Sequence, residues 1–277
     1  MANGRSLHIG LNGVDASQYG GWDGTLNACE ADAHDMKAIA AANGFKSTLL
    51  LTKAATSKAV IAAIADAAAA LHSGDFFLLS YSGHGGQVPD TNGDETEDKM
   101  DETWVCYDRQ VVDDELYALW GKFESGVRIF VLSDSCHSGT VLKAALFGGT
   151  ESPQTFGVKS VESVRAMPPD VQKRTYKAHK KLYDGIQAAN PAGERVSVGA
   201  SVLLFSGCQD SQTSQDGDRN GLFTGTLKKV WNKGAFTGSY RSFHEAILKE
   251  MPPTQTPNFF RAGAVSAAFE RSTPFTI

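Results

Sequence analysis

The feature that most constrains this fold is a set of apolar runs without polar alternation. Three of them, at 75–83, 127–135 and 202–208, read DFFLLSYSG, VRIFVLSDS and VLLFSGC. Continuous runs of this kind are typical of strands that are buried on both faces of a parallel sheet. The sequence therefore predicts an α/β protein with a mostly parallel sheet.

Segments with helical spacing alternate with these strands. Two of them, 27–44 and 56–74, each end at a glycine, which favours helix termination. We expect further strands at 6–14, 45–52 and 256–263, further helices at 221–234 and 239–251, and a loose tail after them. Strands that alternate with helices predict a mostly parallel sheet with helices on both faces.

Two segments interrupt this alternation. Residues 84–110 are predicted to form a long acidic loop, and residues 148–200 are polar and contain a basic helical portion at 170–186. We interpret 148–200 as a linker or insertion between a larger part, 1–147, and a smaller part, 201–277.

Composition narrows the class of protein. The 277 residues carry a net charge of −5 without a dominant basic tract, so we expect no nucleic-acid partner. We see no signal peptide and no stretch near the roughly 20 apolar residues that cross a bilayer, so we expect a cytoplasmic protein without a membrane partner. The cysteines form no CxxC pair, which argues against a disulfide framework or a structural zinc site: Cys29, Cys106, Cys136 and Cys208.

Two apolar strands end in reactive side chains. The run 76–86 ends with His84 between glycines, and the run that ends in SDSCHSG carries Cys136. Binding sites in open α/β sheets form beyond the carboxyl ends of the strands. If the two strands are neighbours, His84 and Cys136 face one cleft.

Such a pair supports nucleophilic chemistry. A thiol with a pKa of about 8.5 is mostly protonated at neutral pH, and a nearby imidazole takes its proton and returns it to a leaving group. Acyl transfer also needs donors for the developing oxyanion, and the N–H groups of Gly85 and Cys136 are candidates.

Other interpretations of these residues remain open. A single cysteine is more often a buried hydrophobe, and a single histidine after a strand is more often a structural hydrogen-bonding group. The pair at two strand ends favours catalysis. A metal site made of His84, Cys136 and His137 lacks a fourth ligand at a recognisable spacing.

The two segments resemble a known family. SYSGHGGQVPDTNGDETEDKMDETW followed by VLSDSCHSGT is similar to metacaspases and their bacterial relatives, the orthocaspases, and the similarity extends to 206–214 and 221–227. It implies one caspase-like peptidase domain over 1–277, with the caspase-hemoglobinase fold around a six-stranded sheet. It also implies His84 as general base, Cys136 as nucleophile and Gly85 in the oxyanion hole.

The resemblance implies a substrate pocket as well. Asp134 matches the acid at the floor of the S1 pocket, the pocket for the side chain before the cleaved bond; Asp32, Cys29 and Ser82 match further pocket residues. Cys29 and Asp32 are three residues apart and share a helix face. Two partly desolvated carboxylates favour Arg or Lys and reject Asp. We therefore expect cleavage after Arg or Lys, although Asp32 alone is equally explained as an exposed or capping acid.

Calcium is an open question in the sequence. The segment 90–102 is rich in hard oxygen ligands but is not an EF-hand, and a solvated acidic loop is the more common explanation of such a segment. Many metacaspases are activated by calcium through acids that resemble Asp98 or Asp101, Asp113 and Asp114. A further acid of that site is replaced here by Lys143. We therefore expect no required cofactor, with calcium as the alternative.

Self-processing is a further expectation from the family. Relatives cut themselves after a basic residue, and this chain offers Lys143, Lys159, Arg165, Lys173, Arg174, Lys180, Lys181 and Arg195, among which the sequence does not choose. The basic helical portion is either a cover over the active site or an ordinary surface helix.

We expect a monomer that acts on protein or peptide substrates. The alternatives are a non-catalytic caspase-like binding module and another peptidase of the same clan, legumain-like or gingipain-like.

Overall fold

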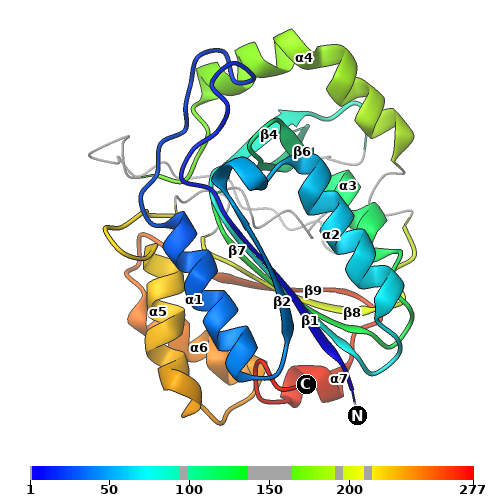
Figure 1. Cartoon of the computed structure of the whole chain (residues 1–277), viewed down its shortest axis with the longest axis vertical. Helices are drawn as coiled ribbons and strands as arrows, with labels where there is room; N and C mark the ends of the chain where they lie inside the picture. The colour runs from blue at the N-terminus through cyan, green and yellow to red at the C-terminus, as the bar shows by residue number, and fades with distance from the viewer. Residues whose placement is uncertain (1, 94–98, 137–163, 191–195, 209–213) are drawn as a thin grey trace.

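One six-stranded sheet forms the centre of the molecule (Figure 1). The computed structural model describes residues 2–93, 99–136, 164–190, 196–208 and 214–277. The sheet order is β2 (Lys46–Leu51), β1 (Gly4–Gly10), β3 (Phe76–Ser82), β7 (Arg128–Asp134), β8 (Ser201–Ser206) and β9 (Asn258–Gly263). All neighbours are parallel except β8 and β9. The prediction of a mostly parallel six-stranded sheet is confirmed.

The register aligns the carboxyl ends of the central strands. Ser82 at the end of β3 lies beside Asp134 at the end of β7, and Gly10 of β1 lies on the other side of Ser82. Ser133 of β7 is level with Ser206 of β8. The turns that follow these strands therefore leave the sheet at one edge, as expected for a binding site in a parallel sheet.

Helices cover both faces of this sheet (Figure 1). The helices α1 (Cys29–Ala42), α5 (Leu222–Trp231) and α6 (Tyr240–Glu250) pack with Leu78 and Phe130. The helices α2 (Ser57–Ala70) and α3 (Asp113–Trp120) pack with Phe77 and Leu79. Successive strand residues point to opposite faces, so each face needs apolar side chains, and this explains the continuous apolar runs.

The segment 84–110 is not the acidic loop that we predicted. It contributes β4 (Gly85–Pro89) and β5 (Met100–Val105), which pair with β6 (Gln110–Val112) in a three-stranded antiparallel sheet. Val88, Trp104 and Val111 are buried in it. These apolar residues are spread among the acids, so the composition of the segment concealed its short strands.

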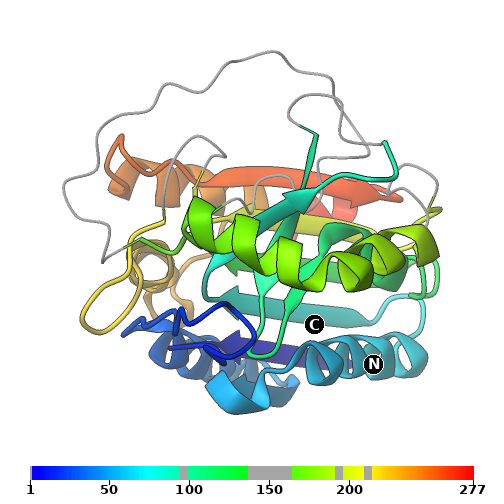
Figure 2. The same ribbon diagram turned by 90° about the horizontal axis from the view of Figure 1, so that it is seen from above.

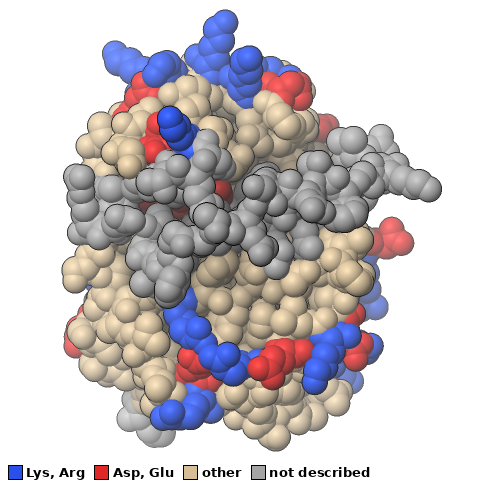
Figure 3. Space-filling model, turned by 180° about the vertical axis from the view of Figure 1, so that it is seen from behind, with Lys and Arg blue, Asp and Glu red and all other residues tan. Residues whose placement is uncertain are grey.

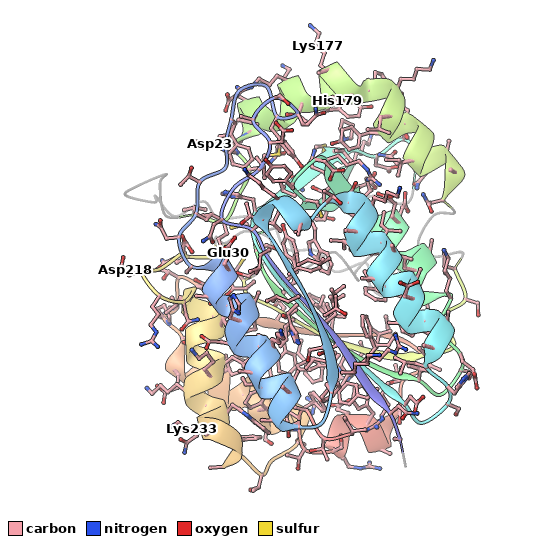
Figure 4. All side chains as sticks on the ribbon, in the orientation of Figure 1. Asp23, Glu30, Lys177, His179, Asp218 and Lys233 are labelled. Carbon is pink, nitrogen blue, oxygen red and sulfur yellow. The ribbon has the colours of Figure 1, made fainter. Side chains whose placement is uncertain are left out.

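Helix α4 (Pro169–Ala189) packs against β4; it lies at the top of the molecule in Figure 1 and crosses in front of the main sheet in the view from above (Figure 2). It contains the basic portion predicted at 170–186. Its own residues Val171 and Tyr183 are buried, whereas its lysines are exposed. Lys and Arg side chains accordingly gather at this end of the molecule (Figure 3). The labelled Lys177 projects outward from α4 (Figure 4).

The tail after β9 is not loose. It forms α7 (Ala267–Arg271), and Phe269 and Phe275 are buried beside Phe130 and Tyr240. Two short 3-10 helices complete the described elements, Thr52–Ala54 and Asn232–Gly234. Within the described residues, no helix has the length and apolar character needed to cross a membrane.

His8 on β1 is a buried neutral side chain that makes the fold sensitive to acid. Its Nδ1 lies 2.8 Å from Ser80 Oγ, and burial, with a smaller contribution from Lys37, lowers its pKa to about 3. A histidine whose pKa falls on folding stabilises the fold above its unfolded pKa of about 6.5, and this contribution is lost as the pH falls below that value.

We expect His8→Asn to reduce the acid sensitivity of the fold. Between pH 7 and pH 5, His8 should account for about 2 kcal/mol of lost unfolding free energy, at about 1.4 kcal/mol per pH unit for each proton. Asn does not titrate and can still bond to Ser80. Urea unfolding of both proteins at the two pH values measures the difference. An equal loss of stability in the two proteins would show that His8 does not titrate in this way.

Candidate active site

The turns that follow β3 and β7 meet at the carboxyl edge of the sheet. Gly85, which follows His84, lies so close to Cys136 that a Cβ atom at position 85 would be 1.7 Å from the Cys136 carbonyl oxygen. Only glycine permits this approach. The neighbouring strands thus bring His84 and Cys136 to one site, as the sequence predicted if β3 and β7 were adjacent.

Two backbone donors converge at this site. The N–H groups of Gly85 and Cys136 donate to the carbonyl oxygen of Arg165, at 3.0 and 3.1 Å. Arg165 belongs to the segment that precedes α4. Paired N–H groups aimed at one carbonyl oxygen are the geometry that stabilises an oxyanion in acyl transfer.

His84 is buried and held by backbone and aromatic contacts. Its Nε2 lies 3.1 Å from the Gly24 carbonyl oxygen, and the Trp22 ring lies 4.7 Å from the imidazole, centroid to centroid. Burial lowers the His84 pKa to about 4, against the opposing effect of backbone groups of Gly24 and Ala166. The imidazole is therefore neutral at pH 7, and its buried Nδ1 has no hydrogen-bond partner among the described residues. A neutral ring with an unused nitrogen is the state that a general base requires.

Cys136 is also buried. The N–H of Ser214 donates to its sulfur at 3.0 Å, so the thiol lies between the Gly85 turn and the segment that begins at Ser214. All four cysteines are among the described residues, and none forms a disulfide.

A buried acidic pocket lies next to these groups. The Arg165 guanidinium forms ion pairs with Asp32, Asp134 and Asp216, with N–O distances of 2.8, 2.9 and 2.9 Å. Its side chain is 0% exposed. Burial alone would lower the Arg165 pKa, but the carboxylates, Asp134 first among them, raise it well above its usual value. Arg165 is thus fully charged inside the protein.

Neutral donors hold each carboxylate in place. Asp134 accepts hydrogen bonds from the Ser214 and Thr224 hydroxyls, at 2.6 and 2.7 Å. Asp32 accepts from the Asn220 amide and the Gly221 N–H, at 2.8 and 3.1 Å.

The third carboxylate, Asp216, is held by backbone groups. It accepts from the N–H groups of Asn27 and Ala28, at 2.7 and 3.3 Å. Its loop lies beside the start of α1, where the labelled Asp218 and Glu30 show the two segments (Figure 4). The pocket is therefore built from the ends of β3 and β7, from α1, and from the 214–224 segment.

The four pocket residues suggested by the family resemblance lie together. Ser82 Oγ donates to Asp32 at 2.8 Å and accepts from Arg165 at 2.9 Å. Cys29 is close enough to Ser82 and Arg165 for both to affect its pKa, yet burial raises that pKa to about 12, so it stays a neutral thiol. Burial, and then Asp134, also raise the Asp32 pKa, against the effect of Arg165. The interpretation of Asp32 as an exposed acid is wrong, because Asp32 is 1% exposed.

Other pocket residues are not marked as such in the sequence. Asp216 lies in DGDRNG, which resembles the start of a calcium loop, and its distance from Asp134 in sequence concealed the contact. Ser214, Thr224 and Gly221 lie in the two C-terminal segments that resemble metacaspases, so the similarity there was the one available signal.

The predicted calcium ligands lie elsewhere. Asp101, on β5, is buried, as are Asp113 and Asp114 at the start of α3, and Asn92 donates to Asp114 at 2.8 Å. Asp98 lies outside the described residues, as does His137, named for a zinc site. The described part of the chain holds no group of three or more His, Cys, Asp or Glu side chains suited to a metal. Because Asp98 belongs to the expected ligand set, calcium binding stays a prediction, and no catalytic step is derived through an ion.

The fold and the site geometry together define a caspase-like domain with a cysteine and a histidine at the carboxyl edge of its sheet. Residues 14–268 match the caspase domain family, so the chain belongs to that family. It is 31% identical to Metacaspase-1 of Kluyveromyces lactis over 263 residues, and 31% identical to Metacaspase-1 of Mycosarcoma maydis over 272 residues. These matches cover 80% and 89% of this chain but 56% and 65% of the relatives, so the chain spans between half and two thirds of their length.

Solved structures agree with this assignment. Protein GSU0716 from Geobacter sulfurreducens is 56% identical, with a TM-score of 0.86 over 99% of this chain and 98% of that one. Caspase-1 from Spodoptera frugiperda is 10% identical, with a TM-score of 0.55 over 99% of this chain and 90% of that one, and shows a shared fold. The family predicted from the His84 and Cys136 motifs is confirmed.

We expect Gly85→Ala to disrupt the contact between the two turns. The added Cβ would overlap the Cys136 carbonyl, and overpacking in a tight site reduces the unfolding free energy by about 1–3 kcal/mol. The control is Gly185→Ala on α4, where a Cβ would meet nothing within 4 Å. That variant should gain up to about 1 kcal/mol through helix propensity. Denaturant unfolding measures both, and equal stabilities for the two variants would contradict the close approach.

Proposed function

We propose that this chain is a cysteine endopeptidase that cleaves peptide bonds after Arg or Lys, with Cys136 as nucleophile and His84 as general base. One observation carries the proposal. Arg165 has its guanidinium among three carboxylates while its own carbonyl oxygen accepts from the Gly85 and Cys136 N–H groups. The substrate residue before the cleaved bond needs the same two contacts at once. Its side chain must bind to the carboxylates, which gives recognition, and its carbonyl oxygen must bind to the two N–H groups, which is required for the reaction.

The chemistry follows from the groups at the site. Neutral His84 takes the Cys136 proton, and the sulfur attacks the substrate carbonyl carbon. The oxyanion that forms is held by the N–H groups of Gly85 and Cys136. His84 then gives its proton to the leaving amine, and water hydrolyses the thioester with His84 again acting as base.

The pocket chemistry supports a basic substrate side chain. An Asp side chain would enter a buried site with three carboxylates, where like charges repel and no cation compensates. Arg fits better than Lys because its Nη1 and Nη2 bond to different groups: Nη1 to Ser82 and Asp134, Nη2 to Asp32 and Asp216. A single ammonium does not reproduce this fork. Protein or peptide substrates and a monomeric state remain predictions.

We expect fluorogenic peptides with Arg before the cleaved bond to be hydrolysed fastest. Lys peptides should follow with kcat/KM lower by roughly 10-fold, and Asp peptides should not exceed background. The Cys136→Ala variant should lose the activity. Hydrolysis of Asp peptides alone, or an active Cys136→Ala variant, would contradict the proposal.

Calcium dependence is checked in the same assay. We expect activity to persist in EDTA, because Lys143 replaces one acid of the family's calcium site. Loss of activity in EDTA that calcium restores would instead support a site that includes Asp98, Asp101, Asp113 and Asp114.

The pocket itself is tested by Gly221→Ala. A Cβ at this position would lie 2.5–2.6 Å from the Arg165 guanidinium atoms, and the Gly221 backbone angles, φ −58° and ψ 152°, suit alanine. We expect kcat/KM for Arg peptides to fall roughly 10- to 100-fold, as for an overpacked site. Gly185→Ala is the matched control and should retain wild-type kcat/KM. An unchanged rate in Gly221→Ala would show that substrate does not bind where Arg165 does.

A further inference from the structure

A short segment of the chain lies extended in the active site like a bound peptide. Val164 bridges to Gln215 in antiparallel orientation, and Ala166 bridges to Gly85 in parallel orientation. The Arg165 N–H donates to the Ser214 carbonyl at 3.0 Å, and the Met167 N–H donates to the Gly85 carbonyl at 2.8 Å. Backbone hydrogen bonds therefore hold the chain on both sides of the Arg165 carbonyl group. Peptides that add to a strand edge are bound in this way.

We propose that the Arg165–Ala166 bond is the self-cleavage site of this chain, cut by its own Cys136, and that the intact segment blocks the site against other substrates. This inference rests on the proposed peptidase function and adds the position of the cut and its intramolecular character. The Arg165 side chain is 0% exposed, so no other residue can use the pocket while Arg165 fills it.

The reaction is balanced with water as the one co-reactant. Cys136 transfers its proton to His84, and a bond forms between the sulfur and the Arg165 carbonyl carbon. The bond from that carbon to the Ala166 nitrogen then breaks, and His84 returns the proton to this nitrogen. Water attacks the thioester, which leaves an Arg165 carboxylate, an Ala166 amine and the free thiol. Ala166, whose nitrogen is the leaving group, bridges to Gly85, the residue that follows His84, so the leaving nitrogen lies on the His84 side of the bond.

The other basic residues of this region are poorly placed for cleavage. Lys173, Arg174, Lys180 and Lys181 lie on the exposed face of α4 in helical backbone. Residues in a helix cannot form the backbone bridges that extended residues 164–167 make with Gln215 and Gly85. Among the described candidates, Arg165 combines extended backbone, a filled acidic pocket and a carbonyl at the two donors. Lys143, Lys159 and Arg195 lie outside the described residues.

The cut should leave the molecule assembled. On the new amino-terminal side, Met167 and Val171 are buried with Tyr19 and Val105, and Tyr183 is buried with Val88 and Val112. The strands β8 and β9 stay paired with the sheet that contains β3 and β7. The fragments 1–165 and 166–277 should therefore co-elute in native buffer and separate only in denaturant.

The test follows self-cleavage of the full chain by mass spectrometry. We expect a cut between positions 165 and 166 in the wild type, in Arg165→Lys and in the control Arg174→Gln, which changes an exposed arginine of α4. Cys136→Ala and Arg165→Gln should stay intact there. The half-time should not change over a 100-fold range of protein concentration. Arg165→Gln, with the pocket emptied, should hydrolyse an added Arg peptide without the lag that precedes cleavage in the wild type.

The outcomes separate the two proposals. Self-cleavage at another bond, a cut in Arg165→Gln at the same position, or a half-time that shortens with concentration would overturn the self-cleavage site or its intramolecular character. Hydrolysis of added Arg peptide by Arg165→Gln would in each case leave the peptidase function standing. A folded Arg165→Gln protein, checked by circular dichroism, that hydrolyses no added peptide while the wild type does not cut itself would overturn both.

Discussion

The site depends on how a buried arginine compensates three buried carboxylates. Isolated charges are very unfavourable in a protein interior, and removal of one partner from a buried ion pair typically reduces stability by about 3–5 kcal/mol. Asp32, Asp134 and Asp216 each accept hydrogen bonds from neutral donors, which position the carboxylates without neutralising their negative charge. A cation is what such a pocket needs, and in this structure the chain supplies it from Arg165.

The parallel sheet fixes the position of the acidic pocket relative to the two backbone N–H donors. Adjacent, in-register β3 and β7 place Ser82 beside Asp134, and the turns after them carry His84 and Cys136. The glycine at 85 lets these turns touch, which aligns two backbone donors without any side chain. Recognition and chemistry therefore use neighbouring residues of the same strands, so the distance from the pocket to the donors is fixed by the fold.

Much of the fold was predictable because its main strands are long and continuous in apolar character. The sequence located the six strands of the main sheet and the helices α1, α2, α5 and α6 from spacing and helix ends. It missed β4 to β6 and α3, which are short and lie among acidic residues, so composition outweighed their buried apolar side chains. It also missed α7, because Phe269 and Phe275 are held by tertiary packing.

The site was predictable only in part, for a different reason. Residues next to the motifs, such as Asp134 and Ser82, are placed by the strands that carry them. Asp216 and Arg165 reach the pocket from loops far away in sequence, and no local pattern marks such contacts. The basic residues of 143–199 look alike in sequence, and only the three-dimensional structure distinguishes Arg165 by its backbone and burial.

The most direct measurement of the central claim is a crystal structure of the full chain with Cys136→Ala, which leaves the segment uncut. We expect the Arg165 guanidinium between the three carboxylates and its carbonyl oxygen within hydrogen-bond distance of the N–H groups at positions 85 and 136. An Arg165 side chain exposed to solvent, with the pocket filled by another residue or by water, would contradict this arrangement.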